Sequence, residues 1–159
     1  MTRPGGGARG GDVRIRRAAA RDAKRLTRLV RTSRAYEGRY AAMVAGYRVG
    51  PDYIETHQVF TAVEPGTDRP LGFYSLILDA AELDLMFVAD EVQGLGIGRL
   101  LMGHLREQAQ GAGLTGVRIV AHPPAEGFYR SVGACRTGTL VADPPVVMWD
   151  RPELLLPIA

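Results

Sequence analysis

The sequence predicts an α/β fold, a mixed sheet flanked by helices in the order β-αα-βββ-α-β-α-ββ. Three adjoining stretches carry this prediction. Residues 82–88 alternate polar and apolar side chains with the period of a strand. Residues 93–98 form a glycine-rich turn, and residues 97–109 repeat an apolar residue every four positions, as one buried face of a helix does. We therefore expect a strand, a tight turn and a long helix at the centre of the fold.

The first third of the chain is predicted to form one strand and two helices. Residues 13–17 alternate apolar residues with arginines and read as the first strand. A helix follows, with Asp22 near its start, and ends before Gly38. Residues 40–47 are predicted to form a second short helix, which Gly50-Pro51 stops.

The remaining elements surround the glycine-rich turn. Residues 58–63 and 71–78 are strand-like and are joined by a hairpin turn that contains Gly66. A G-x-G-x-x-G pattern at 111–116 follows a helix and precedes a strand, the reverse of the dinucleotide-binding order, so we interpret it as a helix end and a connecting turn. The elements predicted after it are a strand at 117–121, a helix at 124–132, and strands at 136–141 and 146–149.

Composition predicts one globular domain. The chain has 159 residues, 46% of them hydrophobic, and we expect a domain at 12–159 behind a glycine-rich, disordered tail at 1–11. Its apolar runs are far shorter than the about 20 residues that span a bilayer, so no membrane partner is expected. The single cysteine, Cys135, cannot form an internal disulfide or a metal cluster, which favours a cytoplasmic location and no bound metal. We expect its side chain to be buried.

The charge balance does not indicate a nucleic-acid partner. The formal net charge is +3, and Lys24 is the one lysine among 20 basic residues, which resembles a compositional bias towards arginine more than a designed patch. The densest basic cluster lies in residues 21–34, with a helical spacing. We interpret it as a solvated helix face rather than a surface for an anionic polymer.

The glycine-rich turn has the chemistry of an anion cradle. Glycines let the backbone approach a ligand closely, and the free N–H groups at a helix start present partial positive charge to a phosphate. A P-loop would need Gly-Lys-Ser/Thr, but Gly98 is followed by Arg99. A dinucleotide fingerprint that starts at Gly94 would need glycine at the position of Arg99. A pyrophosphate carried by another ligand therefore fits better.

Two blocks of the chain resemble the GNAT superfamily of acyl-CoA-dependent N-acetyltransferases. Gln93, Gly96 and Gly98 match the family's pyrophosphate loop, Gln/Arg-x-x-Gly-x-Gly/Ala between a central strand and a long helix. Residues 121–134, AHPPAEGFYRSVGA, resemble its later block, in which a loop leads into a short helix with Ala-x-x-Phe-Tyr. The blocks stand in the family's order. The resemblance implies a largely antiparallel central sheet and the use of acetyl-CoA.

The resemblance also implies a cofactor site made mainly of backbone. A backbone N–H of Phe87 or Val88 would orient the acyl carbonyl and stabilise its negative charge. The residues implied to hold the pyrophosphate are Gln93, Gly94, Leu95, Gly96, Ile97, Gly98 and Arg99. Tyr129 matches the family tyrosine that protonates the leaving thiolate.

Forming the nucleophile requires a base. An amine with a pKa of about 10.4 is neutral in fewer than about one molecule in a thousand at pH 7. The resemblance implies Glu82, at a position where several members carry a glutamate that acts through water, and Asp84 on the same predicted strand face is the second candidate. It stays open whether one of the two instead binds a cationic acceptor or a neighbouring arginine. His122, where relatives often have Asn or Asp, is a further alternative, although a lone loop histidine is more often structural or exposed.

The acceptor is less well defined by the sequence. In the GNAT layout the first helix pair covers the acceptor site, so Ser33, Tyr36, Tyr40 and Tyr47 are acceptor-side candidates, although tyrosines at this spacing also serve in packing. We favour a small-molecule primary amine that attacks directly in a ternary complex. The alternatives are a protein or peptide N-acetyltransferase, and a non-catalytic acyl-CoA-binding regulatory module. The apolar residues 154–158, expected to be exposed, hint at a homodimer.

Overall fold

One seven-stranded sheet organises the computed structural model, which describes residues 13–34 and 46–159. The strands are β1 (Arg14–Arg17), β2 (Gln58–Val63), β3 (Pro70–Ile77), β4 (Glu82–Val88), β5 (Gly116–Val120), β6 (Cys135–Leu140) and β7 (Arg151–Pro157). Their spatial order is β1-β2-β3-β4-β5-β7-β6, and every neighbouring pair is antiparallel except β4 and β5, which run parallel. The predicted mixed, largely antiparallel sheet is confirmed. The predicted tail, residues 1–11, lies outside the described residues.

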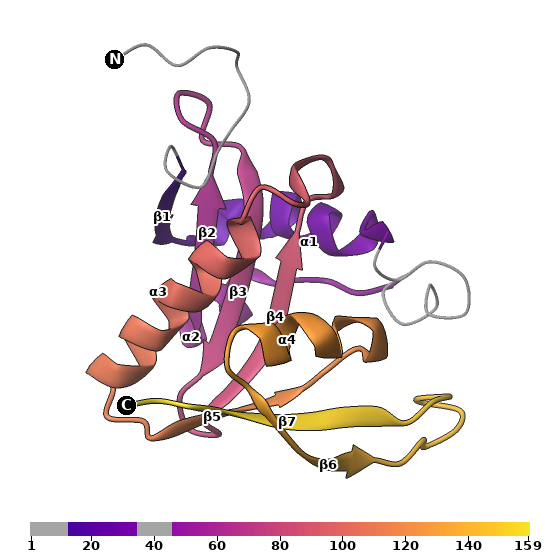
Figure 1. Cartoon of the computed structure of the whole chain (residues 1–159). Helices are drawn as coiled ribbons and strands as arrows, with labels where there is room; N and C mark the ends of the chain where they lie inside the picture. The colour runs from indigo at the N-terminus through magenta and orange to yellow at the C-terminus, as the bar shows by residue number, and fades with distance from the viewer. Residues whose placement is uncertain (1–12, 35–45) are drawn as a thin grey trace.

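Helices cover both faces of the sheet. They are α1 (Ala23–Arg31), α2 (Pro51–Thr56), α3 (Ile97–Gly111) and α4 (Glu126–Ser131). Figure 1 shows α3 and α4 on the near face and α1 across the far face. The predicted apolar stripes are confirmed, because α1 buries Leu26, Leu29 and Val30, and α3 buries Ile97, Met102 and the Leu101, Leu105 and Ala109 series.

The second helix differs from its prediction. Most of the predicted helix at 40–47 lies outside the described residues, and Gly46 and Tyr47 are not helical. Gly50-Pro51, interpreted as a stop, instead begins α2, with Gly50 extended at the N-cap and Pro51 in the first turn. Proline suits this position because the first turn leaves its N–H groups without helical acceptors and because the ring presets a helical φ.

The last strand also differs from its prediction. Residues 146–149 make one isolated bridge, Asp143 with Val147, whereas β7 pairs with β5 and β6. Leu154 and Leu156 are fully buried, whereas Leu155, 41% exposed, and Pro157 face outward, so the expectation of an exposed apolar C-terminus is wrong for Leu154 and Leu156. The sequence does not predict this strand because it contains Pro152, and proline disfavours a central strand. Its carbonyl nevertheless accepts from Ala121 N at 2.9 Å.

Whether two polar residues near the sheet edges are buried is seen only in the structure. Cys135 is exposed on the edge strand β6, so its predicted burial is wrong. Asp22, just before α1, is fully buried and accepts two hydrogen bonds of 2.9 Å from the Arg16 guanidinium. Burial opposes its charge, but the bonds from Arg16 and the Ala19 N–H outweigh burial and lower the pKa of Asp22 to about 2. This ion pair ties β1 to α1.

Candidate active site

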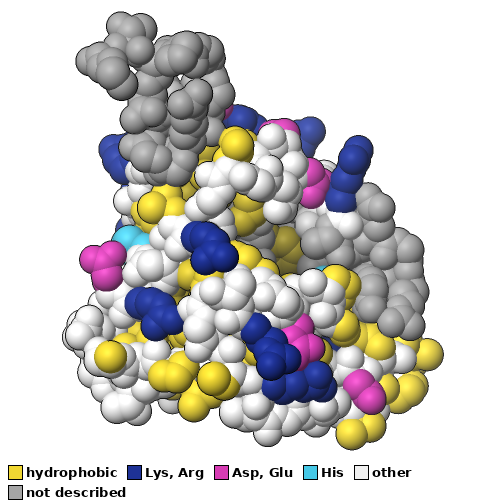
Figure 2. Space-filling view, in the orientation of Figure 1, with side chains coloured by type: hydrophobic (Ala, Val, Ile, Leu, Met, Phe, Trp, Pro, Cys, Tyr) yellow, Lys and Arg dark blue, Asp and Glu magenta, His cyan; other side chains and the backbone are white. Residues whose placement is uncertain are grey.

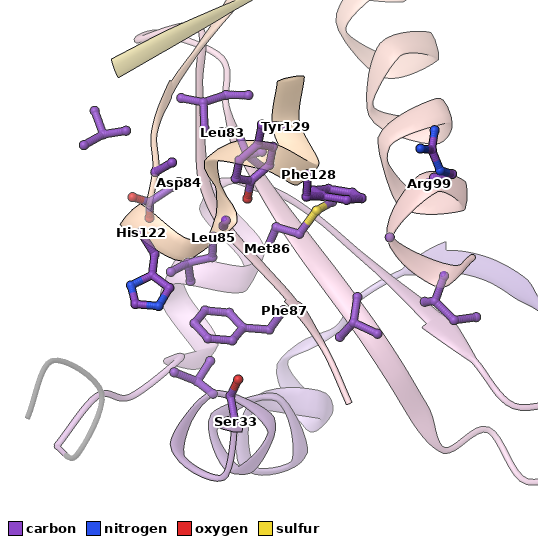
Figure 3. A pocket seen from close by; sticks show the side chains of 18 of the residues that line it. Ser33, Leu83, Asp84, Leu85, Met86, Phe87, Arg99, His122, Phe128 and Tyr129 are labelled. Carbon is purple, nitrogen blue, oxygen red and sulfur yellow. The ribbon is translucent and has the colours of Figure 1, made fainter. Parts of the chain in front are cut away.

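A cleft opens where β4 and β5 part. In the described chain these strands pair at two positions, Glu82 with Arg118 and Leu83 with Ile119. Beyond Leu83 a cavity of about 990 Å³ lies between them, and α4 and the ends of α1 and α3 complete its wall. Figure 2 shows a hollow with hydrophobic side chains on its floor, and Figure 3 shows the lining side chains. Because β5 diverges so early, the later main-chain groups of β4 are open to a ligand.

The glycine-rich turn forms one end of this cavity, at the N-terminus of α3. Gly94 and Gly96 have φ of +81° and +83°, a conformation that glycine adopts without steric cost. A Cβ on either residue would meet no atom within 4 Å, so there is open space in front of the turn. The first N–H groups of α3 have no helical acceptor and point out of its N-terminus. This arrangement fits the pyrophosphate of acetyl-CoA.

The side chains around the turn act as supports. Gln93 Nε2 donates to Val88 O at 3.1 Å and so holds the turn against the end of β4. Arg99 is exposed and donates to Ser131 Oγ at 3.3 Å, which links α3 to α4. Leu95 is 43% exposed and is not part of the cavity wall, unlike the other predicted residues of the turn. A Cβ at Gly98 would lie 3.0 Å from the ring of Phe128, so glycine lets α4 close over this end.

Strand geometry distinguishes the two backbone donors predicted on β4. Ala89 N donates to Leu71 O at 2.8 Å and therefore faces β3. Neighbouring residues of a strand direct their N–H groups to opposite edges, so the N–H of Val88 faces the opening left by β5 and that of Phe87 faces β3. Of the two, Val88 is the one with an N–H suited to a ligand in the cleft.

Asp84 is held at a bulge in β4. Leu83 pairs with Leu76 and Leu85 pairs with Ser75, which leaves Asp84 without a partner on β3 and interrupts the strict alternation that the sequence predicts. The Tyr53 hydroxyl on α2 donates to Asp84 Oδ2 and lies 2.6 Å from Ser75 Oγ. Burial and the bond to Asp84 raise the pKa of Tyr53 far above its usual value, so Tyr53 remains a donor. Tyr53 thus orients one carboxylate oxygen of Asp84, whose exposed side chain lines the cavity.

Glu82 has a different environment. Its Oε2 accepts a hydrogen bond of 2.6 Å from Arg118 Nη1, and the same guanidinium also binds Glu153 on β7. Glu82 lines the cleft, but it is already bound by a neighbouring arginine, the alternative that the sequence left open. Asp84 has no ion pair among the described residues.

Tyr129 and His122 lie on the β5 side of the cavity. Tyr129, on α4, is 8% exposed, and Figure 3 shows Tyr129 and Asp84 turned towards the same hollow. Phe128 contacts the Tyr129 ring edge-on with centroids 5.4 Å apart, which fixes the ring in place. His122 is 7% exposed and lines the same cavity rather than an exposed loop.

The predicted acceptor residues are partly described. Ser33, after α1, faces the cavity from the side opposite Tyr129 (Figure 3), and Tyr47 is also on its wall. Burial and the charge of Asp84 raise the pKa of Tyr47, so its hydroxyl stays protonated. Tyr36 and Tyr40 lie outside the described residues.

Sequence reasoning missed three residues around the cavity. Tyr53 and Ser75 orient Asp84, and Arg151 at the start of β7 lines the wall beyond β5. Ser75 carried a weak signal, as a lone hydroxyl inside the apolar run of residues 71–78. Tyr53 and Arg151 carried none, because each is defined only by contacts with distant segments.

The described residues contain no group of three or more His, Cys, Asp or Glu side chains arranged to hold a metal ion. Within the same residues, no helix has the length and apolar character needed to cross a membrane.

Comparisons with known proteins agree with this geometry. A peptidyl-lysine N-acetyltransferase, YjaB of Salmonella typhimurium, is 27% identical over 136 residues, which cover 82% of this chain and 89% of YjaB. YjaB of Escherichia coli is 34% identical over 76 residues, 48% of this chain and 49% of that protein. The fold resembles a GCN5-related N-acetyltransferase from Rhodopseudomonas palustris, with a TM-score of 0.78, 16% identity and coverage of 91% and 94%.

The family profile described as "Acetyltransferase (GNAT) domain" matches residues 51–142, which is more than half of the chain. The matched region runs from α2 through β4, the glycine-rich turn and α4 to the end of β6. It therefore contains nearly the whole cleft. The chain belongs to the GNAT acetyltransferase family and is an acetyl-CoA-dependent N-acetyltransferase.

Proposed function

We propose that the protein acetylates a small-molecule primary amine by direct attack in a ternary complex, with Asp84 as the base and Tyr129 as the acid. The observation that supports this most is the single cavity that contains Asp84, Tyr129 and the N-terminus of α3. Acetyl-CoA supplies an activated acetyl thioester when bound. The first N–H groups of α3 hold its pyrophosphate, and the Val88 N–H donates to the carbonyl oxygen as negative charge develops there.

Asp84 is the better base of the two carboxylates. Glu82 would have to release Arg118 before it could accept a proton, whereas Asp84 lines the cavity and is bound by Tyr53 through one oxygen only. Asp84 takes the proton of the acceptor ammonium, directly or through water, and so makes its nitrogen nucleophilic. We therefore propose Asp84 as the base in place of Glu82, the residue that the resemblance to GNAT members implies.

Tyr129 completes the proton balance. The bond from the amine nitrogen to the acetyl carbon forms as the carbon–sulfur bond breaks, and the Tyr129 hydroxyl gives its proton to the departing sulfur. The second proton, which the nitrogen loses after attack, then restores the Tyr129 hydroxyl. Its location on α4, against Phe128 and inside the cavity, supports this role. His122 lies on the same wall, and we propose that it lines the site rather than acts as the base.

A peptide lysine is the second candidate acceptor. It is favoured by the similarity to two proteins named as peptidyl-lysine N-acetyltransferases. A small amine is favoured by a cavity whose walls are formed from three sides, by β4, by β5 with α4, and by the end of α1. We also propose a cytoplasmic location, since the chain has a single cysteine, and a domain at 12–159.

The test is release of free thiol from acetyl-CoA with a panel of polyamines, aminoglycosides, amino acids and lysine peptides, with a control that lacks acceptor. We expect acceptor-dependent release that is greatest with a small amine. Release with lysine peptides alone would replace the proposal by the peptide alternative. Binding of acetyl-CoA without release for any acceptor would favour a regulatory acyl-CoA-binding module.

Tyr129→Phe tests the acid within the same assay. We expect kcat to fall by about 100-fold or more while the Kd for acetyl-CoA stays within about twofold. The matched control is Tyr74→Phe, because the Tyr74 hydroxyl bonds His104 Nδ1 at 2.7 Å and lies outside the cavity wall. Unchanged turnover in Tyr129→Phe would remove Tyr129 from the chemistry.

A further inference from the structure

Arg151 lies at the mouth of the cleft, on the wall opposite β4. It is the first residue of β7 and pairs with Leu140 of β6. The next residue, Pro152, accepts from Ala121 N at 2.9 Å, so Arg151 stands beside the end of β5, where the cavity opens. Arg151, Leu140 and His122 all line that cavity. Arg151 thus lines the cavity from β7, on the wall that we assign to the acceptor.

The positive charge of Arg151 is not neutralised within the described chain. Three arginines line the cavity: Arg99 bonds Ser131, and Arg118 is paired with both Glu82 and Glu153. Glu153 is the carboxylate nearest to Arg151 along the same face of β7, and Arg118 already engages it. Arg151 forms no ion pair with a described residue, and its buried Nε has no hydrogen-bond partner among them. Since arginine stays charged in proteins, an acceptor atom from a ligand would relieve this cost.

The two walls of the cleft therefore carry opposite charges. Among the described residues, Asp84 on β4 supplies a carboxylate without an ion pair and Arg151 on β7 supplies a guanidinium without one, with β5 between the two strands. Neighbouring strands lie about 4.8 Å apart, so β4 and β7 are about 10 Å apart where β5 pairs with both, and farther apart beyond Leu83, where β5 leaves β4. A molecule that bridges them has a cationic amine at one end and an anionic group at the other, several bonds away.

We propose that Arg151 binds a carboxylate of the acceptor, so that the acceptor is an aminocarboxylate rather than a plain amine or polyamine. A planar carboxylate matches the fork of the guanidinium, which favours it as the anionic group. The proposal rests on the amine acetylation proposed above and names its substrate class. Free amino acids with a side-chain amine are the expected source, and a lysine peptide with a nearby carboxylate presents the same chemistry.

The test compares acceptors that differ only by the carboxylate: lysine with 1,5-diaminopentane, and ornithine with 1,4-diaminobutane. We expect the wild-type protein to prefer the carboxylate member by about 10- to 100-fold in kcat/KM. Arg151→Gln should abolish this preference by raising KM for lysine and ornithine, while the diamines and the Kd for acetyl-CoA stay unchanged. Arg151→Lys should restore part of it. Arg136→Gln is the matched control, because Arg136 is an exposed arginine of β6 outside the cavity wall.

Two lysine peptides, one with and one without an adjacent aspartate, identify the source of the carboxylate. An Arg151-dependent preference confined to the peptide pair would keep the carboxylate site and assign it to peptides. Equal losses for lysine and diaminopentane in Arg151→Gln, or weaker acetyl-CoA binding, would overturn the proposal.

A binding measurement separates this proposal from the proposed function. Lysine and diaminopentane are titrated calorimetrically into wild type and Arg151→Gln in the presence of CoA. Tighter, Arg151-dependent binding of lysine without thiol release would uphold the carboxylate site and refute acetylation of these amines. Release of thiol with no difference in binding between lysine and diaminopentane would uphold acetylation and refute the carboxylate site.

Discussion

The two ends of the cleft are built in different ways. The end that we propose for the cofactor is a glycine-rich turn and the start of α3, which offers main-chain N–H groups and contains two positive φ angles. The end that we propose for the acceptor is made of charged and hydroxyl side chains that come from α2, β3, β4 and β7. The first tolerates variation in side chains as long as the backbone is kept. The second depends on each individual side chain and its neighbours.

This difference explains how such a fold can keep one co-substrate and change its acceptor. A backbone cradle does not change when side chains on α2 or β7 change, because in the described part of the chain neither Tyr53 nor Arg151 forms a hydrogen bond with the glycine-rich turn. Conversely, the acceptor end can be altered by one substitution. Substitutions at the two ends should therefore separate acetyl-CoA affinity from turnover.

Gly96→Glu should have the largest effect, on the cofactor end. The residue has φ +83°, and the new side chain would place bulk and negative charge where the pyrophosphate binds. We expect the Kd for acetyl-CoA to rise by at least about 100-fold in isothermal titration calorimetry. Gly103→Glu is the control, since Gly103 is exposed on the same helix with no atom within 4 Å of its Cβ position. Equal affinity in the two variants would mean that the cradle is elsewhere.

Asp84→Asn should have the next largest effect, on the acceptor end. We expect kcat to fall by about 100-fold with acetyl-CoA affinity unchanged, because the amide cannot take the amine proton. The remaining rate should increase steadily with pH as more amine becomes neutral in solution. Glu82→Gln should lower kcat by no more than about threefold, since Arg118 already occupies that carboxylate. The opposite pattern would make Glu82 the base and leave Asp84 as a structural residue.

Tyr53→Phe should have the smallest of these effects. The change removes the hydroxyl that orients Asp84, while Ser75 keeps its bond of 3.0 Å from Leu85 N. A hydrogen bond to a charged group contributes about 1.5–3 kcal/mol, so we expect kcat to fall by about tenfold and the acidic limb of its pH profile to shift. A loss of thermal stability with kcat and pH profile unchanged would show that Tyr53 only packs α2 against the sheet.

The fold was largely predictable because its elements are periodic. The strand at residues 82–88 and the four-residue apolar repeat of α3 follow from short segments, and both are confirmed, although the bulge at Asp84 interrupts the alternation of the strand. Glycine at positions 94 and 96 likewise reports a local backbone requirement. The two failures, α2 and β7, are segments where proline has a role that depends on context. Pro51 begins a helix and Pro152 lies in a strand that is stabilised by both neighbours.

The parts of the candidate site that could be predicted are those formed by residues close together in the sequence. The sequence alone determined the glycine-rich turn, the tyrosine of α4 and the presence of two carboxylates on β4, because each belongs to a continuous motif. Only the tertiary structure distinguished those carboxylates, by bringing Tyr53 to Asp84 across 31 residues and Arg118 to Glu82 across 36. It also decided that Arg151 has no counter-charge among the described residues. Charge pairing depends on which side chains meet in space, and strand order and helix packing determine that meeting, whereas turn and helix geometry depend on neighbours along the chain.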